Sequence, residues 1–194
     1  MTFIAVELAQ RLNAIKFKDL PEEAIYWAKV AFADTIACTL AGAHEDCTNA
    51  LDGALEMDRT QGKSLVFGRG RRAGALEATL VNGVASHALD FDDINKSMGG
   101  HPSVTLVPPL LALADEIGSS GADVIEAFIA GYEFECKFAR AINFYHYEKG
   151  WPPTATIGAI GAAAASGILL GLNEAQLTHA LSISASMSSG LKSN

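Results

Sequence analysis

Groups that exchange protons gather in one short segment of the sequence. His87 precedes an acidic run at 90–93, and His101 follows that run after a Gly-Gly pair. An imidazole with an ordinary pKa of about 6.5 gains and loses protons at neutral pH, and a neighbouring carboxylate fixes its tautomer and stabilises its charged form. We therefore predict that His101 is a proton-transfer residue and that Asp90 or Asp93 supplies its carboxylate partner.

The same residue types allow two other interpretations. The aspartates can cap or solvate the loop while His101 hydrogen-bonds locally, which is a structural role. Alternatively, the segment can hold a divalent metal ion, although no pair in it has a known metal-ligand spacing. The ligands would then be His87, Asp90, Asp93 and His101. We expect no metal site and no cofactor, and proton transfer is the function that the segment favours.

The composition indicates a packed helical domain. The chain has 194 residues, of which 49% are hydrophobic and 19% charged, so a disordered segment is excluded. It carries more Ala and Gly than a sheet protein rich in β-branched and aromatic residues, which favours closely packed helices. The length fits one domain of ordinary size. We predict an all-α fold and a single helical domain over residues 1–194.

The charge balance and the cysteines exclude several kinds of partner. Lys and Arg number 14 and Asp and Glu 22, and the net charge of −8 argues against nucleic acid and an anionic membrane. The longest apolar run, at 157–172, is shorter than the roughly 20 residues of a membrane-spanning helix. Three cysteines without a C-x-x-C pair indicate neither a disulfide framework nor a zinc knuckle. We expect a cytoplasmic protein that binds neither nucleic acid nor a membrane.

Apolar periodicity and capping residues predict the elements that position the acidic segment. Residues 90–100 are predicted as an irregular loop between two helices, so the two histidines flank it. A strand is predicted at 64–67. The run Gly68–Ala73 after it resembles a dinucleotide-binding fingerprint, but no β-α-β unit follows, so we interpret it as a hairpin or turn. An aromatic loop at 143–153 is interpreted as a pocket wall or as a cover for the next helix. The predicted helices span 4–12, 21–42, 48–57, 73–89, 103–117, 121–142, 157–172 and 173–187.

Several motifs accompany the acidic segment in a fixed order. The most specific is the Leu-Asp-Phe-Asp-Asp run at 89–93 followed by His-Pro-Ser at 101–103. With these motifs, the sequence resembles the MmgE/PrpD family over nearly its whole length. The resemblance implies a large helical domain, joined in the family to a smaller α+β domain, and a homodimer. Known members include 2-methylcitrate dehydratase and cis-aconitate decarboxylase, which are lyases acting on small tricarboxylic acids without an iron–sulfur cluster. The other matching segments are Asn82-Gly83, Pro108 to Ala114, Gly131-Tyr132-Glu133, and Gly150-Trp151 with Thr154.

The resemblance also implies roles for individual residues. Asp90 matches the family's active-site aspartate and His101 matches the histidine of His-Pro-Ser, so both are expected to be catalytic. Asp93 and His146 are expected to bind substrate. His146 would act as a spatial substitute for a family histidine whose position is occupied by Pro152 in this sequence.

The resemblance has limits that bear on activity. Besides Pro152, Ile94 stands where a threonine is common in the family. The family continues past this point with a lysine-bearing stretch, so we expect the helical domain to be incomplete at Asn194. The expected activity is dehydration, as in 2-methylcitrate dehydratase, or decarboxylation of a small branched di- or tricarboxylic acid. The alternative is a helical domain that binds or assembles without catalysis.

Overall fold

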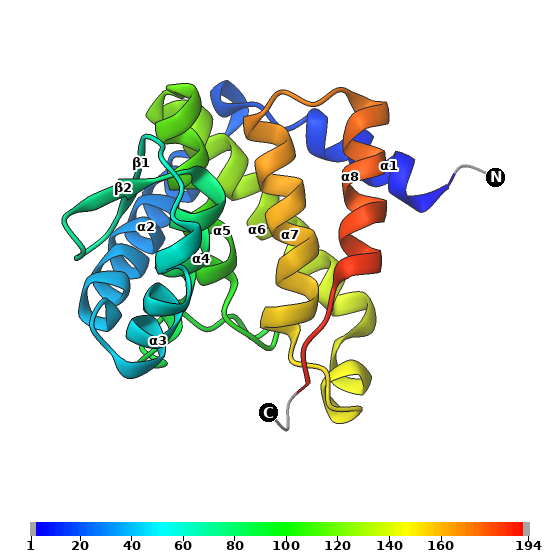
Figure 1. The fold of residues 1–194 in the computed structure, drawn as a ribbon. Coiled ribbons are helices and arrows are strands. Elements are labelled where there is room, and N and C mark those ends of the chain that lie inside the picture. The colour runs from blue at the N-terminus through cyan, green and yellow to red at the C-terminus, as the bar shows by residue number, and fades with distance from the viewer. Residues whose placement is uncertain (1–2, 192–194) are drawn as a thin grey trace.

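Helices form nearly all of the regular structure in the computed structural model of this chain, which describes residues 3–191 without the side chains of Asn143 and Phe144. Over the described range, the helices are accompanied by one two-stranded hairpin, which confirms the predicted all-α fold (Figure 1). The α-helices are α1 (Ile4–Asn13), α2 (Glu22–Gly42), α3 (Asp46–Ala54), α4 (Ala75–His87), α5 (Pro102–Ile117), α6 (Gly121–Glu148), α7 (Pro153–Leu169) and α8 (Glu174–Met187). Two 3₁₀ turns, η1 (Phe17–Asp19) and η2 (Glu56–Asp58), and the strands β1 (Ser64–Val66) and β2 (Arg71–Ala73) complete the order.

The helices α5, α6 and α7 form the centre of the domain. α7 packs along α6 and against α5, while α2 and α4 lie on one side of this centre and α8 and α1 on the other (Figure 1). One core region, around Leu110 and Phe128, is filled by apolar side chains of α2, α5, α6 and α7. Another, around Phe134 and Leu177, lies among α1, α6, α7 and α8. Because α6 and α7 contribute to both regions, they hold the two sides of the domain together.

Small residues let the three central helices approach closely. A β-carbon at Gly158 of α7 would collide with Thr105 of α5, and a β-carbon at Gly161 would collide with Glu135 of α6. Protein interiors are packed as densely as organic crystals, so such contacts leave no room for a larger side chain. The Ala- and Gly-rich composition therefore serves close helix packing.

The hairpin is a structural connection and not a nucleotide-binding loop. β1 and β2 pair antiparallel, with Ser64 opposite Ala73. Arg71 forms ion pairs with Asp52 at 2.6 Å and with Glu77 at 2.7 Å, and both carboxylates belong to neighbouring helices of the same chain. The interpretation of the Gly68–Ala73 run as a hairpin is thereby confirmed.

The helices around the aromatic segment differ from their predicted bounds. α6 continues to Glu148, so the predicted loop at 143–153 is wrong for residues 143–148. No glycine or proline interrupts the chain between Gly131 and Gly150, and helix propensity therefore carries α6 further than the apolar pattern does. Gly150, with φ of 93°, follows its end. α7 begins at Pro153, earlier than predicted, because proline is well suited to the first position of a helix.

One face of α2 is packed and the other is open. Tyr26, Trp27, Val30 and Leu40 are exposed, whereas Thr35 is fully buried. Within residues 3–191, α2 is the one helix that is long and apolar enough to cross a membrane by length and composition. Helices of a protein core can be equally long and apolar, so length and composition do not distinguish them from membrane-spanning helices. α2 packs on α4. α2 therefore combines a packed face with an uncovered apolar face.

Replacement of Gly161 by Ala is expected to destabilise the domain, because the added methyl group would collide with the buried Glu135 side chain. Overpacking of this kind typically costs about 1–3 kcal/mol. Gly53→Ala in α3 is the matched control, since no neighbour lies within 4 Å of the added methyl group. A helical Gly→Ala exchange in open space is neutral or stabilises by up to about 1 kcal/mol. Urea unfolding followed by circular dichroism measures both, and equal stability of the two variants would contradict the close packing of α6 on α7.

Candidate active site

The loop 88–101 joins α4 to α5 and carries the acidic run. His87 is the last residue of α4, and His101 directly precedes α5. Asp90 has φ of 56°, in the left-handed region that Asp adopts more readily than most residues. The two imidazole rings meet with their centroids 4.7 Å apart. The loop therefore brings together two histidines that lie at the ends of different helices.

Asp92 lies between the two imidazole rings. Its side chain is fully buried, with Oδ1 2.9 Å from His87 Nδ1 and Oδ2 3.2 Å from His101 Nδ1. His101 Nδ1 is also 3.3 Å from the carbonyl oxygen of Asp92. Because all these neighbours are hydrogen-bond acceptors, each Nδ1 is assigned a proton that it donates to Asp92. In neutral His101, Nε2 is then the nitrogen that accepts a proton.

Asp90 lies beside that second nitrogen. Its Oδ1 is 3.5 Å from His101 Nε2 and 4.0 Å from His87 Nδ1, and its side chain is exposed. The structure thus brings the two predicted catalytic residues together. The carboxylate that orients the His101 ring is Asp92, which the sequence reasoning passed over in favour of Asp90 or Asp93. Residue types alone could not choose among three aspartates in four positions.

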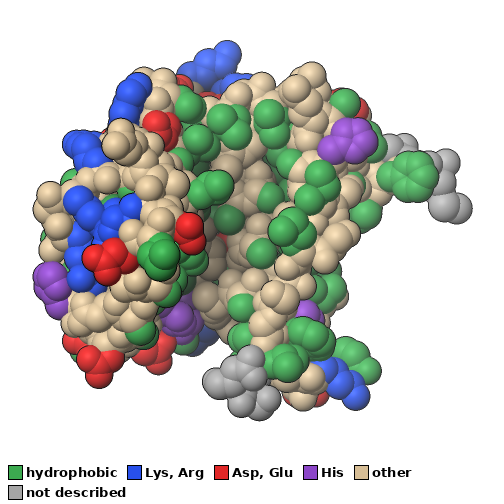
Figure 2. All heavy atoms as spheres, viewed as in Figure 1, with side chains coloured by type: hydrophobic (Ala, Val, Ile, Leu, Met, Phe, Trp, Pro, Cys, Tyr) green, Lys and Arg blue, Asp and Glu red, His purple; other side chains and the backbone are tan. Residues whose placement is uncertain are grey.

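His101 borders a hollow of about 1070 Å³ between α4, α5 and the start of α7. Figure 2 shows this face hollowed between the side that carries α3 and α4 and the side that carries α7. Thr105, Thr154 and the two histidines supply polar groups, and none of the described lining residues is Lys or Arg. The rest of the lining is mostly apolar, including Leu80, Val84, Ile94, Val104 and Pro152. A ligand in this hollow would therefore meet the two histidines on a wall that is mostly apolar, with a few hydroxyl groups.

Asp93 bonds to the start of α5 and not to the histidines. Its Oδ1 accepts from the Ser103 amide at 3.1 Å and its Oδ2 from the Ser103 hydroxyl at 2.7 Å. It thereby satisfies a donor in the first turn of a helix, where amides have no partner in the helix itself. Burial raises the pKa of Asp93, and the charges of Asp92 and Asp34 add to this, against hydrogen bonds from Ser103 that lower it. Asp93 holds the helix that follows His101, and its binding of substrate stays a prediction.

His146 lies at the end of α6 beside the wall of the hollow. Thr156 Oγ1 donates to the Pro152 carbonyl at 3.0 Å, so His146 Nε2 donates its hydrogen to that same Oγ1 at 2.7 Å. The His146 ring also stacks on Trp151, with centroids 6.4 Å apart. These contacts tie α6 to the first turn of α7, where Pro152 lines the hollow. Substrate binding by His146 stays a prediction.

A buried acid lies behind the hollow. Thr105, which lines it, has its Oγ1 2.7 Å from Glu135 Oε1 and 2.7 Å from the Pro102 carbonyl. One hydroxyl hydrogen cannot serve both, and burial raises the pKa of Glu135 well above its ordinary value. Burial thus favours the neutral form of Glu135 more than that of an exposed carboxyl group, against the hydrogen bond from Thr105, which lowers the pKa. The sequence contained a signal for this burial, because Glu135 is four residues from both Gly131 and Ala139 on one helix face.

The histidines and aspartates are also close enough to hold a metal ion. The ligand atoms of His87, Asp90, Asp92 and His101 all lie within 4.8 Å of one another. This set differs from the predicted alternative, because Asp92 occupies the place expected for Asp93. His87 Nδ1 already bonds to both oxygens of Asp92, at 2.9 and 3.1 Å, so a bound metal ion would have to displace this contact.

The fold and the site together define a helical domain with a histidine–carboxylate group placed for acid–base chemistry at a hollow. The sequence model of the MmgE/PrpD N-terminal domain matches residues 6–194. The chain therefore belongs to the MmgE/PrpD family, as the motifs predicted. Of the two residues that match the family's active-site positions, His101 lines the hollow and Asp90 lies beside it, 3.5 Å from Nε2.

Curated relatives carry names of one kind. The chain is 29% identical to the cis-aconitate decarboxylase-like protein oryM of Aspergillus oryzae over 97% of its length, which is 41% of that protein. It is 28% identical to cis-aconitate decarboxylase of Aspergillus terreus, over 98% of the chain and 40% of the relative. With human cis-aconitate decarboxylase the identity is 29%, over 94% of the chain and 39% of the relative. The chain thus spans about two fifths of the length of the curated relatives it matches.

The stability of the domain is expected to depend on pH through His87. The hydrogen bond to Asp92 raises the pKa of His87, and the charges of Asp92 and Asp90 add to this, against partial burial that lowers it. Because the pKa of His87 is higher in the folded state, protonation of its ring stabilises the fold. This stabilisation is fully present below the pKa of the unfolded state, about 6.5, and is lost as the pH rises through the pKa of the folded state. The free energy of unfolding should therefore fall over that interval.

Urea unfolding at a series of pH values, together with an NMR titration of the His87 ring, measures this dependence. Asp92→Asn should return the titration of His87 toward its ordinary pKa, whereas Asp115→Asn, a matched change far from the histidines, should leave it unaltered. A His87 titration that is the same in all three proteins would refute the assigned pairing with Asp92.

Proposed function

We propose that the chain forms the N-terminal part of a lyase that removes water or carbon dioxide from a small branched di- or tricarboxylic acid. The observation that carries this proposal is the position of His101. Asp92 holds its ring through Nδ1, and Nε2 remains for proton transfer beside Asp90 at the edge of the hollow. Membership of the MmgE/PrpD family and the names of the curated relatives support the same chemistry.

Both reactions need a proton transfer at a carbon next to a carboxylate. In dehydration, a base takes the proton from this carbon, the electron pair forms the double bond, and hydroxide leaves the neighbouring carbon with a proton as water. In decarboxylation, the bond to the departing carboxylate breaks, and its electron pair takes up a proton at the carbon left behind. In our proposal, His101 Nε2 accepts the proton during dehydration. During decarboxylation, the protonated His101 ring delivers a proton from Nε2 to the carbon.

The remaining residues have supporting roles in this proposal. The carbonyl oxygen of Asp92, 3.3 Å from Nδ1, keeps a proton on that nitrogen of His101 and so holds the ring in one tautomer. Asp90 orients the transferred proton or engages the substrate next to Nε2. Asp93 and His146 act on the substrate site through the first turns of α5 and α7, which they hold. Together these contacts would keep the reacting groups in place without a rearrangement during the reaction.

A di- or tricarboxylate substrate needs positive charge that the described hollow does not supply. Its lining within residues 3–191 offers two histidines and neither Lys nor Arg. We therefore propose that cationic groups from elsewhere in a longer chain, or from a second copy in a homodimer, bind the substrate carboxylates. We propose a cytoplasmic location on the basis of the composition, including cysteines that remain free.

A second candidate function is a helical domain that binds a ligand or a partner without turnover. The apolar wall of the hollow favours it, and so do Ile94 and Pro152, which contribute no proton-transfer group to that wall. This function predicts binding of a carboxylic acid with no chemical change and no exchange of its carbon-bound hydrogens.

Proton NMR in D₂O distinguishes the two functions. The chain, alone and within a longer protein that contains it, is incubated with 2-methylcitrate, citrate and cis-aconitate. We expect turnover or deuteration next to a carboxylate, reduced about 10²- to 10⁴-fold by His101→Ala, since positioned acid–base groups contribute on this scale. Asp92→Asn should lower the rate while leaving a folded protein, because it removes the negative charge 3.2 Å from His101 Nδ1 and keeps a side chain of nearly the same size.

His179→Ala on the exposed face of α8 is the control for the loss of an imidazole far from the hollow. Circular dichroism should report the same helix content for all variants. Full activity of His101→Ala would remove His101 from the mechanism. Absence of turnover and of exchange with every substrate, in both the chain and the longer protein, would favour the non-catalytic domain.

A further inference from the structure

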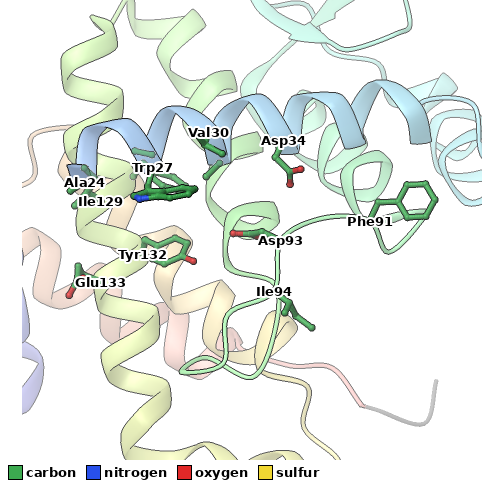
Figure 3. A pocket seen from close by; sticks show the side chains of 13 residues that line it. Ala24, Trp27, Val30, Asp34, Phe91, Asp93, Ile94, Ile129, Tyr132 and Glu133 are labelled. Carbon is green, nitrogen blue, oxygen red and sulfur yellow. The ribbon is translucent and has the colours of Figure 1, made fainter. Parts of the chain in front are cut away.

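A second hollow lies on the opposite side of the loop 88–101 from the one that His101 borders. It has a volume of about 560 Å³ and lies between α2, α6 and this loop. We call it the Trp27 hollow. Figure 3 shows Trp27 and Asp34 of α2, Tyr132 of α6 and Asp93 of the loop around the same space. Trp27 and Asp34 are seven residues apart, so they lie on one face of α2. This hollow is separate from the candidate active site and does not depend on the proposed function.

The described lining of the Trp27 hollow contains carboxylates and no cationic side chain. Asp34, Asp93 and Glu133 line it, and no Lys or Arg is among its described lining residues. Glu133 is half exposed and forms an ion pair with Lys137 at 2.9 Å. Both oxygens of Asp93 accept hydrogens from Ser103. Two of the three carboxylates therefore have partners within the domain.

Asp34 is the carboxylate that lacks a partner. Its Oδ2 is buried and has no hydrogen-bond partner among the described residues. A buried polar atom without a partner costs free energy, about 1–3 kcal/mol and more for a charged group. Asp34 as a whole is only partly buried and lines the hollow, so a donor in the hollow could approach the accessible part of this carboxylate and share its negative charge. The unmet requirement at this position is for a hydrogen-bond donor that carries positive charge.

Aromatic rings supply the other part of the surface. Trp27, Phe128 and Tyr132 line the hollow, with the Phe128 and Tyr132 rings 5.6 Å apart. Tyr132 is held by a hydrogen bond from Asn95 Nδ2 to its hydroxyl at 3.1 Å. The faces of Trp and Tyr rings attract organic cations, most strongly where water is excluded. Aromatic faces beside an unpaired carboxylate match an ammonium group on an apolar body.

We propose that the Trp27 hollow is a binding site for a small organic cation, an alkyl- or arylammonium compound whose nitrogen bonds to Asp34 and whose apolar part lies against Trp27 and Tyr132. Anionic ligands are repelled by Asp34 and Asp93. A hydrated divalent metal ion is disfavoured, because it requires about six or more oxygen ligands and most of this lining is hydrocarbon. Charge and apolar surface together therefore select the ligand class.

The test uses three ligands of the same shape and different charge. These are 2-phenylethylammonium, the uncharged 2-phenylethanol and the anionic 3-phenylpropanoate, each titrated into the chain by isothermal calorimetry at one fixed salt concentration. We expect the ammonium compound to bind about tenfold or more tightly than the alcohol, which corresponds to one charge-assisted hydrogen bond of about 1.4 kcal/mol. We expect no measurable binding of the anion.

Variants of the lining assign the binding to this hollow. Asp34→Asn should reduce the affinity for the ammonium compound to that for the alcohol. Glu133→Gln removes one negative charge from the rim of the same hollow, and it should have little effect because Glu133 is exposed and paired with Lys137. Trp27→Leu, at an exposed position, should weaken binding about threefold or more through the lost cation–π contact. Unchanged helix content by circular dichroism establishes that each variant is folded.

Three results would overturn the proposal. The first is equal affinity for the ammonium compound and the alcohol, which would make the hollow a general apolar site. The second is unchanged binding of the ammonium compound by Asp34→Asn. The third is a chain that does not bind the ammonium compound but self-associates in sedimentation, with the self-association abolished by Asp34→Asn. This result would mean that a side chain of a second copy occupies the hollow.

Discussion

The buried carboxylate of Asp92 is the constraint on which the arrangement of the site depends. A charged group withdrawn from water is stable only where hydrogen bonds replace its hydration. His87, the last residue of α4, bonds to both carboxylate oxygens, and His101, the residue before α5, places Nδ1 3.2 Å from Oδ2 and 3.3 Å from the Asp92 carbonyl oxygen. The loop between them must therefore turn back on itself, and the left-handed backbone of Asp90 belongs to this turn. The exposed Asp90 side chain consequently lies beside the free nitrogen of His101.

The helices supply a rigid base for this loop. α5 packs on α4, α6 and α7 through small residues, and the collisions that a β-carbon at Gly158 or Gly161 would cause leave little freedom for α7 to shift. Between these helices, buried Glu135 and Thr105 form a hydrogen-bonded pair directly behind the hollow. Asp93 satisfies the first turn of α5 from outside the helix. Thus the position of His101 is set by packing and by polar contacts at the same end of α5.

The loop 88–101 separates two hollows of different character. The larger is bordered by the histidines and is otherwise mostly apolar, whereas the Trp27 hollow combines aromatic rings with an unpaired carboxylate. Ile94 lines both of them. The three aspartates of the loop thus have different surroundings. Asp90 lies on the exposed side of His101, Asp92 lies between the two imidazole rings, and Asp93 bonds to Ser103.

The sequence by itself determined the helical fold, most helix ends, the loop at 90–100 and the pairing of Asp90 with His101. These features follow from local chemistry and from motif order: apolar spacing repeats along each helix, and Asn173 and Gln176 form the capping box that begins α8. The tertiary structure alone decided which aspartate contacts His101 Nδ1, that the pKa of Glu135 is raised, and that Asp34 Oδ2 has no hydrogen-bond partner among the described residues. Each of these depends on burial and on donors contributed by residues distant along the chain, such as Thr105 for Glu135 and Ser103 for Asp93. Spacing along one helix or loop does not encode these contacts, because they arise only when the helices pack.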